Sequence, residues 1–250
     1  MAYNRAVFIT GSNRGLGLQF AKELAKNENY RHVFAACRKP NDAQELLSIA
    51  KENSKVQIVQ LDVQNDQDIH SAVEVVNKKV GGNGLNLLIN NAGISINGGP
   101  IPTVNRSDFM KVMDVNVSSP IMLTKAFYRL LRAASNPSST RDIFLPAVVV
   151  NMSSILGSIE SNNAESGVLY PYRCSKAALN MATKSMAIEF APRNIIAITM
   201  HPGWVRTDLG GPKAPLFVEE SIKGMMNVIE NLNLSDSGKL LGYDGSNIPW

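Results

Sequence analysis

Tyr172 and Lys176 are four residues apart in a segment of helical periodicity, and together they could carry out acid–base chemistry. On a helix, side chains four positions apart project from the same face, so a phenol and an ammonium would be neighbours. A phenol has a reference pKa near 10, and a nearby positive charge favours its ionised form. We therefore predict that Lys176 lowers the pKa of Tyr172, so that the phenol exchanges a proton with a carbonyl oxygen at cellular pH.

A glycine-rich turn near the start of the chain could bind phosphate groups. It follows a β-branched segment, Arg5–Thr10, and opens a segment of helical period, Gly15–Asn27. Glycines at such a turn let the backbone approach a pyrophosphate, and the N-terminus of the helix offers free N–H groups. The spacing G-x-x-x-G-x-G in this position predicts a dinucleotide site made by Gly11, Ser12, Asn13, Arg14, Gly15, Leu16 and Gly17.

The end of the next predicted strand indicates which dinucleotide binds. NAD-binding proteins usually carry an acidic residue about 20 positions after the glycines, bonded to the ribose 2′-OH. Here the strand ends in Ala-Ala-Cys-Arg-Lys, with Arg38 and no acid. A guanidinium offers a fork of donors to a 2′-phosphate, and Arg14 in the glycine turn could reach the same group. We therefore predict NADP, in its reduced form NADPH, as the cofactor.

Short apolar runs alternate with amphipathic segments, which is typical of crossover units and a parallel sheet covered on both faces. We predict an α/β fold: a single-domain, Rossmann-type doubly wound parallel sheet of about seven strands in the order 3-2-1-4-5-6-7, over residues 1–250, with helices on both faces. Strands are expected at Arg5–Thr10, His32–Ala36, Val56–Gln60, Leu85–Ile89, Ala147–Met152, Ile195–Met200 and Lys239–Leu241. Helices are expected at Gly15–Asn27, Ala43–Glu52, Asp66–Val80, Arg106–Ala133, Pro171–Phe190 and Glu219–Asn231.

Composition excludes several classes of protein. Of the 250 residues 44% are hydrophobic, and the net charge of +4 is spread without basic runs, so we expect no nucleic-acid binding. The two cysteines, Cys37 and Cys174, have no metal-ligand spacing and are expected to be reduced thiols. No apolar run is long enough to span a bilayer and no leader is recognisable. We expect a cytoplasmic protein with no metal and no membrane association.

Further motifs follow the other predicted strands, namely Asp62-Val63, Asn90-Asn91-Ala92-Gly93, Ser153-Ser154 and Pro202-Gly203, and Asn116 lies in the predicted long helix. Together with the glycine turn and Tyr172–Lys176, these motifs resemble the short-chain dehydrogenase/reductase family over essentially the whole chain. Two segments, His201–Asp208 and Gly242–Trp250, are most similar to sniffer-type carbonyl reductases.

The resemblance implies a role for each matching residue. Tyr172 would be the general acid, Lys176 would bind the nicotinamide ribose, and Ser154 would hold the substrate carbonyl and stabilise the developing alkoxide. Asn116 would fix a water that links Lys176 to solvent. The implied cofactor contacts, besides the glycine turn, are Arg38, Asp62, Val63, Asn90, Ala92, Gly93, Tyr172, Lys176, Pro202, Gly203, Val205 and Thr207.

In one respect the chain departs from the family pattern. The separation between Ser154 and Tyr172 is longer than usual, with the extra residues in Ser158–Leu169. Loop length is a weak thermodynamic constraint, so the two side chains can still meet. The insertion leaves open whether Ser153 or Ser154 faces the tyrosine; the alignment of the strand favours Ser154. Tyr170 is a weaker candidate acid, because Cys174 and not a cation lies four residues on.

The substrate pocket is expected outside the carboxyl ends of the strands. Its predicted walls are apolar and include Ile94, Ile155 and Trp204, with residues 203–218 as a substrate-binding loop. These walls predict an uncharged aldehyde or ketone, with no positioned cation for a substrate carboxylate unless Arg206 serves as one. The leading hypothesis is an NADPH-dependent carbonyl reductase, with a homo-oligomer possible through the helices of Asn116 and Tyr172. The alternatives are an NAD-linked alcohol dehydrogenase and a non-catalytic, NADP-sensing regulatory protein.

Overall fold

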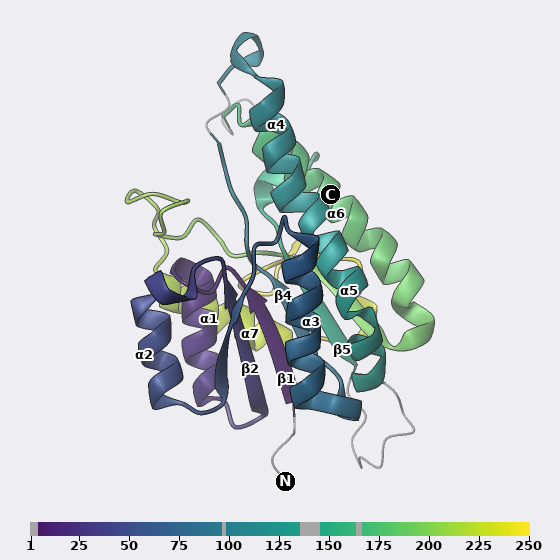
Figure 1. Cartoon of the computed structure of the whole chain (residues 1–250). Helices are drawn as coiled ribbons and strands as arrows, with labels where there is room; N and C mark the ends of the chain where they lie inside the picture. The colour runs from purple at the N-terminus through teal and green to yellow at the C-terminus, as the bar shows by residue number, and fades with distance from the viewer. Residues whose placement is uncertain (1–4, 97–98, 136–145, 164–166) are drawn as a thin grey trace.

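A computed structural model describes residues 5–96, 99–135, 146–163 and 167–250. One sheet of eight strands, in the order β3-β2-β1-β4-β5-β6-β7-β8, forms the centre of the molecule (Figure 1). The first seven strands are parallel in the predicted order, and β8 adds an antiparallel edge to β7 that the sequence did not predict. The strands are β1 (Arg5–Thr10), β2 (Tyr30–Cys37), β3 (Val56–Gln60), β4 (Leu87–Asn90), β5 (Ala147–Met152), β6 (Ile195–His201), β7 (Leu240–Gly242) and β8 (Asn247–Ile248).

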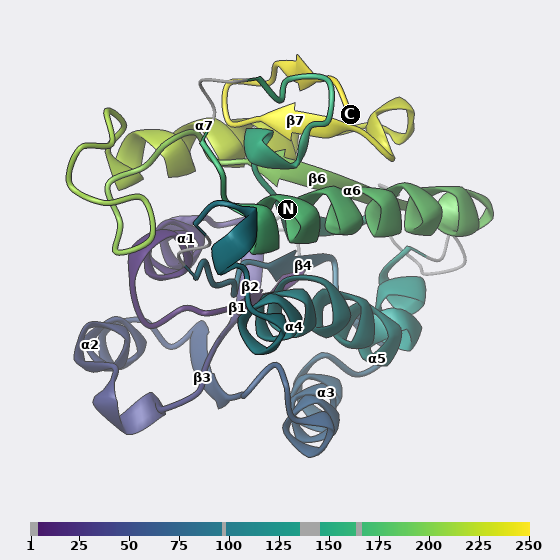
Figure 2. The same ribbon diagram turned by 90° about the horizontal axis from the view of Figure 1, so that it is seen from above.

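Helices cover both faces of the sheet (Figure 2), as the sequence predicts. On one face α1 (Gly15–Lys26), α2 (Gln44–Glu52) and α7 (Val218–Glu230) pack against one apolar cluster. On the other face α3 (Asp66–Val80), α5 (Ser119–Ala134) and α6 (Tyr170–Phe190) pack against a second. Because both faces are buried, the central strands are almost wholly apolar, as expected for parallel sheets.

The predicted long helix over Arg106–Ala133 is interrupted. The structure has α4 (Arg106–Met113) and α5, joined by one π-helical turn at Asp114–Ser118. Pro120 has no N–H to donate to the carbonyl of Asn116, so the α-helical bonding pattern cannot continue there. Such widened turns are frequent at functional sites, and this one carries the buried Asn116. In Figure 1, α4 rises above the sheet, on the side opposite the N-terminus.

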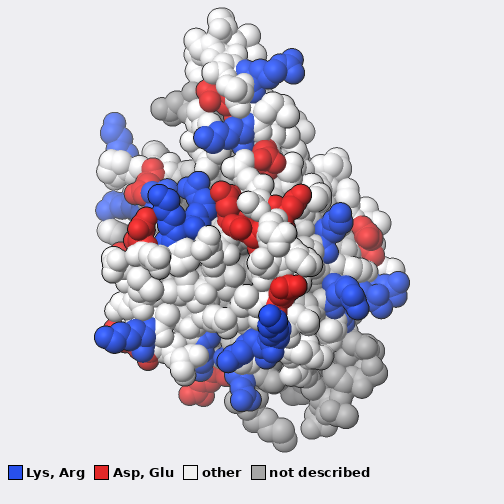
Figure 3. All heavy atoms as spheres, viewed as in Figure 1, with Lys and Arg blue, Asp and Glu red and all other residues white. Residues whose placement is uncertain are grey.

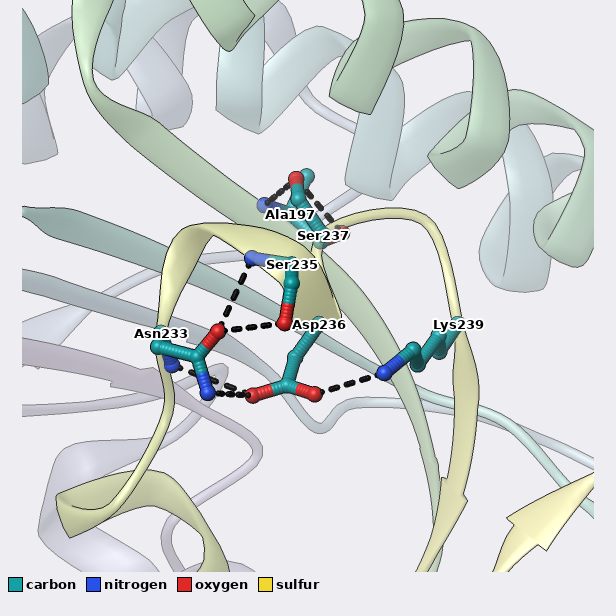
Figure 4. Close-up of polar contacts among 6 residues, drawn as sticks. All are labelled: Ala197, Asn233, Ser235, Asp236, Ser237 and Lys239. Atoms are coloured by element: carbon teal, nitrogen blue, oxygen red, sulfur yellow. Dashed lines mark hydrogen bonds and ion pairs between the residues drawn. The ribbon is translucent and has the colours of Figure 1, made fainter.

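A compact polar turn fixes the connection from α7 to β7 (Figure 4). The side chain of Asn233 accepts a hydrogen bond from the N–H of Ser235, and the carboxylate of Asp236 accepts one from the N–H of Asn233, which completes a capping box. Lys239 Nζ donates to Asp236 Oδ1 at 2.8 Å. Ser237 Oγ accepts from the N–H of Ala197 at 3.1 Å, which joins the turn to β6. The turn therefore sets where β7 enters the sheet.

Charged side chains of both signs are mixed on the surface. On the face shown in Figure 3, Lys and Arg side chains are interspersed with Asp and Glu side chains. No helix in the described part of the chain is long and apolar enough to cross a membrane. Within the same residues, no group of three or more His, Cys, Asp or Glu side chains could hold a metal ion.

Candidate active site

The glycine turn lies between the carboxyl end of β1 and the start of α1. Helix α1 begins at Gly15, and within the described residues its N-cap residue Arg14 makes no side-chain hydrogen bond to the N–H groups of the first turn. A Cβ on Gly17 would lie 2.2 Å from the carbonyl oxygen of Gly11, so only glycine allows the helix to approach the turn this closely. The side chain of Ser12 points inward and donates to the Ile9 carbonyl at 3.0 Å, while Asn13 is exposed. The turn therefore offers backbone, rather than serine hydroxyl, to a phosphate.

Thr10 and Asn91 join the glycine turn to the end of β4, a role that was not predicted for either residue. Thr10 Oγ1 accepts hydrogen bonds from the N–H groups of Asn91 and Ala92 at 3.0 and 2.9 Å, and Asn91 Nδ2 donates to the Thr10 carbonyl at 2.9 Å. The neighbouring Asn90 instead extends into the interior, where its Nδ2 donates to Asn151 Oδ1 at 2.7 Å. A threonine ending the first strand of such a motif was the signal that could have revealed this bond.

Two arginines lie at the edge where the sequence predicts a 2′-phosphate site. Arg38 follows β2 and is exposed, with no hydrogen bond or ion pair to any residue that the structure describes. Arg14 donates to Asp208 Oδ2 at 2.5 Å, which joins the glycine turn to the 203–218 loop. Asp62, at the end of β3, accepts from the N–H of Gln64 at 3.1 Å; Val63 beside it is half-buried.

The Ser154 hydroxyl faces the Tyr172 phenol and acts to lower its pKa. Ser154 follows β5, Tyr172 lies in the first turn of α6, and both are at least nine-tenths buried. Ser153 points elsewhere and donates through Oγ to Asn180 Oδ1 at 2.6 Å. Of the two serines it is therefore Ser154 that faces the tyrosine, despite the insertion between them. Part of that insertion, residues 164–166, lies outside the described residues.

The electrostatics of the pair differ from the sequence prediction. Burial raises the pKa of Tyr172 to about 12, and the hydrogen bond with Ser154 opposes that rise only in part. Burial also lowers the pKa of Lys176, to about 8. Lys176 Nζ donates to the Met152 carbonyl at 2.8 Å and lies 5.4 Å from the centroid of the Tyr172 ring. The predicted lowering of the tyrosine pKa by Lys176 is wrong for this structure: burial raises that pKa, and Ser154 is the one group that opposes the rise among the described residues.

Asn116 connects three parts of the site from its π-helical turn. Its Oδ1 accepts from the N–H of Ile94 at 2.9 Å, and its Nδ2 donates to the Ile94 carbonyl at 2.9 Å and to Ser175 Oγ at 3.0 Å. Ser175 Oγ in turn donates to the Tyr172 carbonyl at 2.7 Å. Asn116 therefore holds the segment after β4 against the first turn of α6. Gly93 is exposed beside it: a Cβ there would lie 3.7 Å from Lys176 Nζ.

The 203–218 loop is held by its own side chains. Arg206 Nε donates to the Ala214 carbonyl at 2.6 Å, and its guanidinium lies 4.3 Å from the centroid of the Phe217 ring. Trp204 Nε1 donates to the Gly210 carbonyl at 2.7 Å. Arg206, the cation considered as a partner for a charged substrate, is therefore engaged within the loop.

The start of the same loop lies against the glycine turn. A Cβ on Gly15 would lie 3.5 Å from the Thr207 methyl group, and the buried Val205 bridges to Leu216. The Pro202 carbonyl accepts from Ser221 Oγ at 2.6 Å. Gly203 next to it is packed under Leu216 and Tyr243. Ile155 and Trp204 expose 41% and 57% of their surface and could contact an apolar ligand.

A doubly wound parallel sheet with a glycine turn after its first strand is the architecture of dinucleotide-binding proteins. The chain belongs to the short chain dehydrogenase family, which matches it over residues 5–215. Two solved structures are similar over 99% of this chain and 100% of their own. They are the carbonyl reductase Sniffer of D. melanogaster (37% identity, TM-score 0.94) and an NADPH-bound carbonyl reductase from chicken fatty liver (37%, TM-score 0.92). An uncharacterized oxidoreductase of Schizosaccharomyces pombe is 33% identical, over 99% of this chain and 98% of its own.

Proposed function

We propose that this protein is an NADPH-dependent carbonyl reductase for uncharged aldehydes or ketones with an apolar body. The observation that carries the proposal is that the Ser154 hydroxyl faces the Tyr172 phenol, with Lys176 buried one helical turn further along α6. Support comes from the two similar structures whose names describe carbonyl reductases, one of them with NADPH bound.

The residues around the glycine turn fit a phosphorylated dinucleotide. The uncapped N-terminus of α1 and the glycine backbone suit a pyrophosphate, and the exposed Arg38 and Arg14 suit a 2′-phosphate. NADPH bound there would supply a hydride. The residues proposed to hold it are Gly11, Ser12, Asn13, Arg14, Gly15, Leu16, Gly17, Arg38, Asp62, Val63, Asn90, Ala92, Gly93, Tyr172, Lys176, Pro202, Gly203, Val205 and Thr207.

In the proposed reaction the chain supplies the proton and fixes the substrate oxygen. Ser154 Oγ would donate a hydrogen bond to the carbonyl oxygen, and the Tyr172 hydroxyl would transfer its proton to the same oxygen as the alcohol forms. A pKa of about 12 keeps that phenol protonated at neutral pH, which is the form that reduction requires. Alcohol oxidation would instead need the phenolate.

Lys176 and Asn116 would support the pair formed by Ser154 and Tyr172. Lys176 would contact the nicotinamide ribose, and its charge would help return a proton to Tyr172 after turnover. Asn116 would hold the water through which that proton arrives. Because Arg206 is engaged with Ala214 and Phe217, the apolar surface of Ile155 and Trp204 dominates the choice of substrate.

The test is turnover with NADPH and NADH on a panel of aldehydes, ketones and quinones, using two matched tyrosine variants. Tyr172→Phe should reduce kcat by roughly 10²- to 10⁴-fold while NADPH still binds, because it removes only the proton donor. Tyr170→Phe, in the same helical turn, should retain wild-type activity. Equal activity of wild type and Tyr172→Phe would overturn the proposal, and so would NADPH binding without turnover of any carbonyl, as expected of a sensor.

Titration of the protein with NADPH and with NADH tests which of the two it prefers. Arg38→Ala should weaken NADPH binding by roughly 10- to 100-fold and leave NADH binding unchanged, since only NADPH carries the 2′-phosphate. Tighter binding of NADH than NADPH, unaffected by Arg38→Ala, would instead support the NAD-linked alcohol dehydrogenase. The proposal of an oligomer is separate, and Met181 and Ile188, which expose 68% and 69% of their surface on α6, support it.

A further inference from the structure

Asn180 continues a stripe of polar residues on α6 that begins with Tyr172 and Lys176. The three are spaced by four residues, so all lie along one face of the helix. Like the other two, Asn180 is buried, with 3% of its surface exposed. A polar side chain this deep is expected to have a specific set of partners, since leaving it unpaired would cost free energy.

Both ends of the Asn180 amide bind the segment that carries Ser154. Its Oδ1 accepts from Ser153 Oγ at 2.6 Å, and its Nδ2 donates to the Gly157 carbonyl at 3.2 Å. Ser154 lies between these two attachment points, but none of its own bonds is to Asn180 in the part of the chain that the structure describes. One amide therefore holds residues 153–157 at two points, on either side of the hydroxyl that meets Tyr172.

The segment is also packed directly on the helix backbone at Lys176. A Cβ on Gly157 would lie 2.7 Å from Lys176 Cβ and 2.8 Å from the Lys176 carbonyl carbon, so no larger residue fits. This close approach places the Gly157 carbonyl within reach of Asn180 one turn later. The position of Ser154 relative to Tyr172 is thus set from α6 itself, by packing at Lys176 and by hydrogen bonds at Asn180.

We infer that Asn180 is a positioning residue for carbonyl reduction, which fixes Ser154 against Tyr172 by holding Ser153 and Gly157. The inference rests on the proposed function. Only an amide offers both an acceptor for the Ser153 hydroxyl and a donor for the Gly157 carbonyl at this length. An ionised Asp would keep the first bond and lose the second. A Leu, which has the same branching at Cγ, would lose both and leave two buried polar groups unpaired.

The first experiment compares kcat with cofactor affinity. Asn180→Leu should lower kcat by roughly 10- to 100-fold, because a displacement of a catalytic group by about 1 Å costs that much. The dissociation constant for NADPH should stay within about twofold of wild type, since Asn180 is remote from the glycine turn. Thr183→Val is the matched control. Thr183 is buried on the same helix but bonds to Asn151 of β5, so this variant should lose some stability and retain kcat.

A double-mutant cycle shows whether Asn180 acts through Ser154. If it does, Ser154→Ala combined with Asn180→Leu should be no slower than Ser154→Ala alone. Additive losses, or a wild-type kcat for Asn180→Leu, would overturn the inference. Should Asn180→Leu fail to fold, Ser153→Ala removes the same bond from the other side and should lower kcat in the same way; a wild-type kcat for that variant would also overturn it.

Failure of this inference can be told from failure of the proposed function. If carbonyl turnover depends on Tyr172 but not on Asn180, only the positioning role is wrong. If Tyr172→Phe is as active as wild type, the proposed function itself is wrong, whatever Asn180 does.

Discussion

Lys176 Nζ donates a hydrogen bond to the main-chain carbonyl of Met152 at 2.8 Å, at the point where β5 ends. One carbonyl replaces only part of the hydration that a buried ammonium loses, and burial lowers the pKa of Lys176 to about 8. The buried charge of Lys176 therefore lowers the free energy of unfolding. Sites that serve chemistry commonly carry such a cost, and removing the charged group can stabilise the protein.

Lys176→Met should therefore abolish turnover and stabilise the fold at pH 7, by about 1–3 kcal/mol in the free energy of unfolding. In the folded protein this pKa is lowered from 10.5, so the unfolded chain binds more protons between about pH 8 and 10.5. The cost of the buried charge is fully present below pH 8 and is relieved as the pH rises. Urea unfolding of both proteins from pH 7 to 9.5 should show the difference narrowing; a constant or widening difference would contradict this account.

The Arg14–Asp208 ion pair gives a prediction about cofactor choice. Both side chains are mostly exposed, at 70% and 72%, so the pair contributes little to stability. Asp208→Asn should free Arg14 for a 2′-phosphate and tighten NADPH binding by roughly 2- to 5-fold at low salt, with NADH unaffected. Fluorescence titration of both nucleotides at two salt concentrations measures this. A parallel gain for NADH would mean that Asp208 acts on some other part of the dinucleotide.

Arg206 holds the 203–218 loop through its contacts with Ala214 and Phe217. These contacts are predicted to depend on the geometry of the guanidinium and not on its charge. Arg206→Lys keeps the positive charge but cannot reproduce both the Nε bond to Ala214 and the stacking on Phe217. Arg206→Lys and Arg206→Ala should therefore behave alike: faster proteolysis within residues 203–218 and a several-fold higher KM for an apolar ketone. If Arg206→Lys matched wild type while Arg206→Ala did not, the charge itself would be the contribution.

The sequence was sufficient for the sheet order, the glycine turn and the family, because these depend on strand–helix alternation and on residues fixed to particular strand ends. It was not sufficient for features that depend on burial or on contacts between residues far apart in the chain. The π-helical turn at Asp114–Ser118 follows from Pro120 acting on one backbone bond inside an otherwise helical pattern. The raised pKa of Tyr172 and the partners of Arg206 depend on desolvation and on chain folding, which residue spacing does not encode.

The turn between α7 and β7 provides a stability test remote from the site. Partial burial alone would raise the pKa of Asp236, but hydrogen bonds from Lys239 and from the Asn233 backbone lower it overall from 3.8. A carboxylate with a lowered pKa contributes stability above its unfolded pKa and loses it as the pH falls through the folded value. Asp236→Asn should thus cost about 0.5–1 kcal/mol at pH 7, the size of a capping interaction, without changing kcat. Guanidinium unfolding at decreasing pH should show this difference vanishing below pH 3.8. A difference that persisted undiminished in acid would mean that the Asp236 carboxylate is not what stabilises the turn.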